Sequence, residues 1–181
     1  SGTKPSSKKT PGVKVPVEQY ELDKATDSIR DASLSLGHNI KGIIGKPRSF
    51  NRLKQVHKTV SLAEDIYIVG QIGGKNNRLT GPQTQWAAQM GIDMGKRVYV
   101  YHMNPKDPKL EGWHKWSSTN EVFVKMKRVP KPKRNFAGFG DKIMTKGGEK
   151  AITDFYETYF PKKKITKAQL KKEAEADKDI R

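Results

Sequence analysis

Residues 66–103 read IYIVGQIGGKNNRLTGPQTQWAAQMGIDMGKRVYVYHM, and this stretch decides the fold. The β-branched and aromatic runs at 66–69 and 98–101 are typical of strands buried on both faces of a parallel sheet. Between them, apolar residues recur at helical spacing from Pro82 to Gly95, and Pro and Gly are favoured where helices begin and end. The order strand, loop, helix, strand predicts a right-handed βαβ unit whose two strands are parallel neighbours.

A βαβ unit places a crevice at the carboxyl end of its first strand. The loop after that strand and the start of the helix form its walls. Their free backbone N–H groups and the helix dipole make the crevice a candidate anion site. On pattern alone, a core βαβ unit with a flexible loop and no ligand explains the same residues.

The composition describes a strongly basic chain. The 181 residues hold 36 Lys and Arg against 19 Asp and Glu, a formal net charge of +17. A charge of this size predicts attraction to a polyanion. There is no cysteine, which excludes disulfides and thiolate chemistry, and the four His lack zinc-site spacing, so we expect no metal and no cofactor. The sequence shows neither a long apolar run nor a signal-peptide core, so we expect an intracellular protein, in a host cytoplasm or a virion.

Composition also divides the chain into three parts. Residues 1–16 are rich in Ser, Pro and Lys without an acid, which predicts a basic extended arm. Residues 17–160 carry the apolar periodicity and fit a single α/β domain. Residues 161–181 place six lysines before four acids, which predicts a charged tail that is disordered or helical only on a partner.

Further periodicity predicts the elements around the βαβ unit. Helices are expected over residues 17–36 and from Pro47 through Val60, whereas residues 40–45 fit either a short strand or a hydrophobic turn. A last helix is expected over residues 150–160. Its predicted inward residues are Ile152, Phe155, Tyr156 and Tyr159.

A small hairpin is expected between the second strand and the last helix. The segments 112–116 and 122–127 read as short strands joined by a turn at 117–120. Trp113 and Trp116 are expected to cover a sheet edge. Stacking on a nucleic-acid base is the alternative for these two rings.

Three stretches combine cations with an absence of acids, and they form the predicted nucleic-acid interface. The first lies on the helix after Pro47, the second joins the hairpin to residue 136, and the third opens the tail. Pro130 and Pro132 keep the second stretch extended, which suits contact with a phosphate backbone. A solvated helix face and a flexible connecting loop are the alternatives. The predicted binding residues are Arg48, Arg52, Lys54, Lys58, Lys125, Lys127, Arg128, Lys131, Lys133, Arg134, Lys162, Lys163 and Lys164.

No catalytic constellation is visible in the sequence. The Ser residues lack a nucleophile motif, and the residues 73–77, GGKNN, match neither a Walker loop nor a dinucleotide fingerprint. The four histidines, His38, His57, His102 and His114, stand in unrelated contexts. The sequence therefore favours a protein that is not an enzyme and assigns no catalytic residue.

Three segments together resemble a known family. They are residues 61–72 (SLAEDIYIVGQI), 84–103 with the following GWHKW, and 136–160 (FAGFGDKIMTKGGEKAITDFYETYF). In order, spacing and residue type they resemble a phage-associated branch of the SLOG superfamily. Its members are Rossmann-like proteins related to the LOG phosphoribohydrolases and to DNA-processing protein A. The resemblance covers roughly residues 56–160 and implies a three-layer, Rossmann-like parallel sheet with flanking helices. Residues 8–12, KKTPG, resemble a further family segment.

The chain departs from the family pattern at the proposed phosphate turn. Where the family has GGTGW, this chain has Pro82-Gln83-Thr84-Gln85-Trp86, so three glycines are replaced. Proline removes a donor N–H, and each Gln side chain takes space over the helix start. The family's SGGA-type glycine loop also has no counterpart in this sequence. We therefore expect the fold to be kept and small-nucleotide binding to be weakened.

Three functions follow as hypotheses. The first is a non-catalytic protein that binds RNA or DNA through its basic arms, as a viral, phage or ribonucleoprotein component. The second, implied by the resemblance, is a nucleotide sensor or a phosphoribohydrolase-like enzyme, with a pocket lined by Gly70, Gln71, Thr84 and Gln89. The third is an assembly protein whose tails contact neighbouring subunits. Charge and the lost glycines favour the first.

Overall fold

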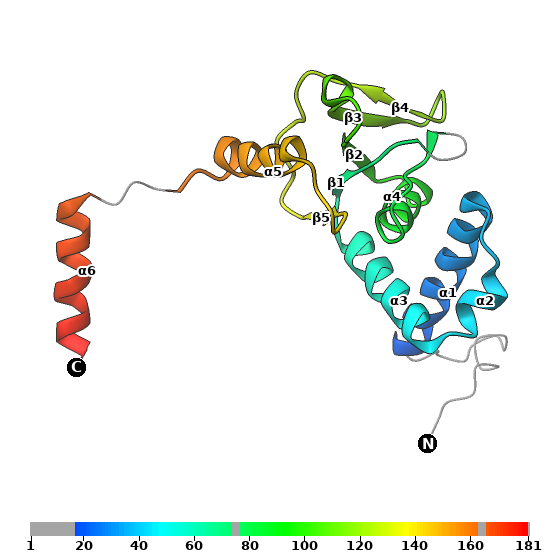
Figure 1. Ribbon diagram of the computed structural model, residues 1–181. Coiled ribbons are helices and arrows are strands. Elements are labelled where there is room, and N and C mark those ends of the chain that lie inside the picture. The colour runs from blue at the N-terminus through cyan, green and yellow to red at the C-terminus, as the bar shows by residue number, and fades with distance from the viewer. Residues whose placement is uncertain (1–16, 74–76, 163–165, 181) are drawn as a thin grey trace.

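A five-stranded sheet forms the centre of the protein (Figure 1). The computed structural model describes residues 17–73, 77–162 and 166–180. The strand order is β4-β3-β2-β1-β5. The strands are β1 (Asp65–Gly70), β2 (Arg97–His102), β3 (Gly112–Ser117), β4 (Val122–Lys125) and β5 (Phe136–Gly140).

The strand directions confirm the Rossmann-like α/β fold. β1 pairs in parallel with β2 on one side and with β5 on the other, so the predicted βαβ unit is present. β3 and β4 form the predicted hairpin and add to the β2 edge in antiparallel orientation. The sheet is therefore mixed rather than wholly parallel, because a hairpin joined to β2 by a short connection returns antiparallel to it.

Helices cover both faces of the sheet. α1 and α3 pack with α4 on one face, and α5 lies on the other (Figure 1). The helices are α1 (Val17–Leu36), α2 (Ile40–Ile44), α3 (Pro47–Leu62), α4 (Thr84–Asp93), α5 (Lys146–Tyr159) and α6 (Lys167–Ile180), with a 3₁₀ turn at Pro108–Leu110.

Alternate residues of the central strands divide the core into two layers. Ile66 and Ile68 of β1 face α1, α3 and α4, and they belong to the larger apolar cluster. Tyr67 and Tyr99 face the other way and stack on each other at 5.1 Å, with Phe155 of α5 beside them. Because side chains alternate between the faces of a strand, any residue packed on Tyr67 lies on the face opposite to α3.

Local capping explains two helices outside the strong apolar patterns. α2 replaces the expected strand or turn because the Asn39 side chain accepts a hydrogen bond from the Lys41 N–H at 3.0 Å. α6 forms in the tail that was expected to be disordered or helical only on a partner. The Thr166 hydroxyl accepts from the Gln169 N–H and the Gln169 side chain accepts from the Thr166 N–H, which is a capping box in front of good helix formers.

The structure changes details of the predicted packing at α5 and at Trp116. α5 begins at Lys146, four residues before the predicted start, since the Thr145 hydroxyl caps the Gly148 N–H at 3.0 Å. Tyr156 was expected to face inward but is 49% exposed. Trp116 packs on Phe123 and lies under the guanidinium of Arg78, so its role is structural.

Candidate functional sites

The second predicted basic stretch crosses the sheet on the α5 face, and we call residues 125–134 the basic ribbon. It leads from the end of β4 to the start of β5. Within the ribbon, the side chains of Val129 and Pro132 are buried. Its six cations are all exposed: Lys125, Lys127, Arg128, Lys131, Lys133 and Arg134. None of the six forms an ion pair with another residue in the described part of the chain. Lys125 pairs with His114 in the sheet and lies near the His102 and His114 rings, on the face away from α5. The other five cations follow β4, and the ribbon presents their charges to solvent.

Hydrogen bonds fix the backbone of the basic ribbon along its length. The Met126 N–H donates to the carbonyl of Trp113 at 2.9 Å. The Tyr67 hydroxyl donates to the carbonyl of Pro130 at 2.8 Å, and the Tyr159 hydroxyl donates to the carbonyl of Val129. These bonds argue against the alternative of a flexible connecting loop. An ordered backbone lowers the entropy cost of presenting the cations to a partner.

Asp65 connects the far end of the ribbon to the sheet. Its carboxylate is fully buried and accepts from the Arg97 side chain at 2.6 Å and from the Lys133 N–H at 2.8 Å. The hydrogen bond to Asp65 is the main cause that raises the pKa of Arg97. One buried carboxylate thus holds the start of β1, the start of β2 and the ribbon together.

The cations predicted on α3 lie on the other face of the sheet. Arg48, Arg52, Lys54 and Lys58 belong to a helix whose buried residues pack in the larger cluster. The ribbon instead packs through Val129 on the Tyr67 face. The structure therefore splits the predicted interface into two surfaces that the sheet separates. From the tail, Lys162 is exposed, and Lys163 and Lys164 lie outside the described residues, as does the arm at 1–16.

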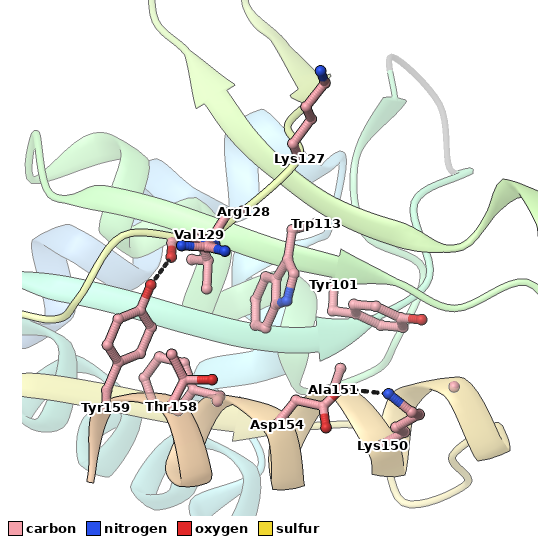
Figure 2. A pocket seen from close by; sticks show the side chains of 12 residues that line it. Tyr101, Trp113, Lys127, Arg128, Val129, Lys150, Ala151, Asp154, Thr158 and Tyr159 are labelled. Carbon is pink, nitrogen blue, oxygen red and sulfur yellow. Dashed lines mark hydrogen bonds and ion pairs between the residues drawn. The ribbon is translucent and has the colours of Figure 1, made fainter.

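A pocket lies between the basic ribbon and α5, and we call it the ribbon pocket (Figure 2). Its volume is about 370 Å³. Figure 2 shows Trp113 between Arg128 of the ribbon and Asp154 of α5, with Tyr101 beside it. Burial raises the pKa of Tyr101 to about 12, and its hydroxyl donates to Glu111 at 3.1 Å. The pocket thus combines an aromatic wall with a cationic rim.

A larger cleft lies at the carboxyl ends of β1 and β5, and we call it the switch-point cleft. The chain leaves β1 through α4 towards β2, whereas β5 lies on the opposite side of β1, and such reversal points are where ligands bind in α/β sheets. The cleft volume is about 960 Å³. Lys46, Arg52 and Lys142 line it, together with Gln83 and Gln85. The two glutamines form its wall without closing it.

The four residues predicted for a nucleotide pocket have different positions. Gln71 lines the switch-point cleft. Gly70 and Thr84 are buried beneath it. Gln89 lies away from the lining residues, buried in α4, and its amide donates to Asp93 at 2.9 Å. The structure thus brings only one of the four side chains to the cleft surface.

Asp141 lies at the start of α4, a position that no sequence pattern indicated. Thr84 donates a hydrogen bond from its hydroxyl to the Asp141 carboxylate at 2.7 Å. A Cβ atom on Gly81 would stand only 2.1 Å from the same carboxylate, so glycine is required there. A carboxylate near a helix N-terminus interacts favourably with the helix dipole. The protein's own anion therefore lies where a bound phosphate was expected.

Two histidines that appear unrelated in sequence meet in the structure. His102 ends β2, and its ring lies 5.8 Å from that of His114 on β3. The Nδ1 atom of His102 accepts a hydrogen bond from the Ile72 N–H at 2.9 Å, so this nitrogen carries no proton. Burial lowers the pKa of His102 below its ordinary value of 6.5, with smaller effects from His114 and Lys125 against Glu111.

Acidification should lower the stability of the fold through His102. Because the pKa of His102 is lowered on folding, the unfolded chain takes up the proton first, so the free energy of unfolding falls as the pH drops below about 6.5. His102→Gln should make this fall shallower, although His57 and His114 also have lowered pKa values and keep part of it. Urea unfolding at several pH values measures the effect. An identical pH dependence in the variant would contradict the assignment.

The described residues offer no group of His, Asp and Glu arranged to hold a metal ion. No helix in the described ranges has both the length and the apolar character to cross a membrane.

His38 stacks on Trp86 at 5.2 Å and its Nε2 lies 3.3 Å from the Gln85 side chain, so it shapes the wall of the switch-point cleft.

Comparison with known proteins returned no match among protein-family models, curated proteins or solved structures. The resemblance to the SLOG superfamily therefore stays a prediction from residue patterns. The assignment of the fold rests on the strand order and directions in the structure.

Proposed function

We propose that the protein binds nucleic acid along the basic ribbon and does not catalyse a reaction. The observation that carries this proposal is a set of five exposed cations, Lys127, Arg128, Lys131, Lys133 and Arg134, on a backbone held by hydrogen bonds. None of the five forms an ion pair with a described residue. Ordered cations at successive positions suit a chain of phosphates, because phosphate contacts supply most of the affinity for nucleic acids. The formal net charge of +17 adds long-range attraction. The resemblance to phage-associated proteins favours a phage or ribonucleoprotein component.

A salt titration tests this function. Fluorescence anisotropy with labelled single-stranded DNA and RNA should give an affinity that falls linearly on a log–log plot against salt. If the five cations from Lys127 to Arg134 contact phosphates, the slope should be about −3.5, since each contact contributes roughly −0.7 on a single strand. Binding should vary little with base sequence. An affinity that does not respond to salt, or no binding at low salt, would contradict the proposal.

The switch-point cleft supports a second candidate function, the sensing of a nucleotide. Its volume of about 960 Å³ and its position at the strand reversal are the observations that favour this candidate. The Asp141 carboxylate would repel a phosphate at the start of α4. We therefore place the phosphate against the cations that line the cleft, Lys46, Arg52 and Lys142.

A thermal-shift screen with nucleotides tests the cleft. A ligand at about 100 times its dissociation constant should stabilise the fold by roughly 2.7 kcal/mol. Arg52→Gln should reduce that stabilisation, whereas Lys54→Gln, two residues further along α3 and outside the cleft lining, should not. Asp141→Asn should strengthen binding because it removes a repelling charge. A flat screen with wild-type protein would leave only the ribbon as a binding site.

A further inference from the structure

The ribbon pocket has features that phosphate binding alone does not use. Trp113 makes ring contacts with Tyr67 at 86°, with Tyr101 at 77° and with Phe155 at 42°, so none of them is a parallel stack. Trp113 is half-buried and lines the pocket. Among the described residues, Trp113 therefore has edge-on or tilted aromatic neighbours and no parallel one.

Polar side chains lie on two opposite sides of the pocket rim, one formed by the ribbon and the other by α5. Lys127 and Arg128 of the ribbon lie at one side, where a phosphate backbone would pass. Lys150 and Asp154 of α5 lie at the other, joined by an ion pair of 2.7 Å (Figure 2). Thr158, one turn beyond Asp154, is exposed and also lines the pocket. The α5 side thus offers donors and acceptors to the edge of a planar ring.

We propose that the ribbon pocket receives one unstacked base of a single-stranded nucleic acid whose backbone follows the basic ribbon. This inference rests on the proposed binding of nucleic acid by the ribbon and adds the class of nucleic acid. The base lies against Trp113, its edge faces Asp154 and Thr158, and its phosphate meets Arg128. The pocket volume of about 370 Å³ lies in the range of roughly 300–1,000 Å³ typical of small-molecule sites.

The geometry selects single strands over duplexes. A base inside a duplex is stacked and paired, so it must be flipped out before it can enter a recess between the ribbon and α5, and flipping costs free energy. A single strand presents its bases without that cost. Every base has a π-face, so the pocket adds affinity without strong sequence preference. The pocket and the ribbon bind a base and its phosphate, and both RNA and DNA provide these groups.

The test compares matched oligonucleotides and matched variants by fluorescence anisotropy. The probes are a single strand of about 12 nucleotides as DNA and as RNA, the corresponding duplexes, and a single strand of abasic sites. Trp113→Leu removes the aromatic wall, and Trp116→Leu is its control because Arg78 covers that ring outside the pocket. Thr158→Leu narrows the pocket from its exposed side, and Thr153→Leu is the control on the same helix.

Wild-type protein should bind the base-bearing single strand at least about 5-fold more tightly than the duplex or the abasic strand. Trp113→Leu and Thr158→Leu should remove that preference, and the two controls should keep it. The Thr158 variant keeps the test independent of any folding defect in the Trp113 variant. Equal binding of all probes by the wild type, or a preference that both pocket variants retain, would overturn the inference while leaving ribbon binding intact. No binding to any probe at low salt would overturn the proposed function as well.

Discussion

Replacing four ribbon cations by glutamine is expected to lower the affinity for single-stranded nucleic acid by roughly 10²- to 10³-fold near 0.1 M salt. The variant changes Lys127, Arg128, Lys131 and Arg134, whose side chains are exposed and form no ion pair with a described residue. Each lost phosphate contact removes about 0.7 from the salt slope, so the slope should become shallower by about 3. Anisotropy titrations at several salt concentrations give both numbers.

The helix α3 provides a control with the same change of charge. Replacing Arg48, Arg52, Lys54 and Lys58 by glutamine also lowers the formal net charge of +17 by four. These residues lie on the opposite face of the sheet, so a strand bound along the ribbon should lose little affinity. Equal losses in the two variants would mean that overall charge, rather than the ribbon, determines binding.

Asp65→Asn is expected to cause the largest loss of stability among single polar changes. The substitution removes a fully buried charge that accepts hydrogen bonds from Arg97 and from the ribbon backbone at Lys133. Breaking a buried pair costs about 3–5 kcal/mol. Because the Arg97 side chain is 39% exposed and water can solvate it, we expect roughly 2 kcal/mol in the free energy of unfolding. Urea denaturation measures this loss.

The same substitution should also weaken nucleic-acid binding, because the ribbon loses its anchor at Lys133. Asp27→Asn is the matched control, since the Asp27–Arg30 pair is exposed on α1 and remote from the ribbon. It should leave both stability and affinity unchanged within error. Should Asp65→Asn lower stability without altering affinity, the ribbon would not need a fixed backbone to bind.

Elements with strong local signals could be predicted from the sequence. The runs 66–69 and 98–101 are long enough and apolar enough to identify two buried strands, and the segment between them has helical periodicity. α2 was missed, and α6 was expected only on a partner, because their signals are capping residues rather than apolar spacing: Asn39 for α2, and Thr166 with Gln169 for α6. Short local hydrogen bonds determined these two elements.

The sites depend on contacts that the sequence does not display. The Tyr67 hydroxyl reaches a ribbon carbonyl 63 residues away, and that bond turns a predicted extended strip into an ordered surface. Asp141 meets Thr84 across 57 residues and takes the position expected for a phosphate. His102 and His114 meet because of the register between β2 and β3. The sequence shows where cations are concentrated along the chain. Which of these cations lie on the same face of the sheet depends on the fold.

The central claim is that a single strand lies along the ribbon with a base in the ribbon pocket, and photo-crosslinking tests it most directly. A single strand that carries photoreactive bases is bound at low salt and irradiated, and the crosslinked peptides are identified by mass spectrometry. We predict crosslinks in the ribbon at residues 125–134 and at Trp113 or Tyr101. Crosslinks confined to α3 or to the switch-point cleft would contradict it.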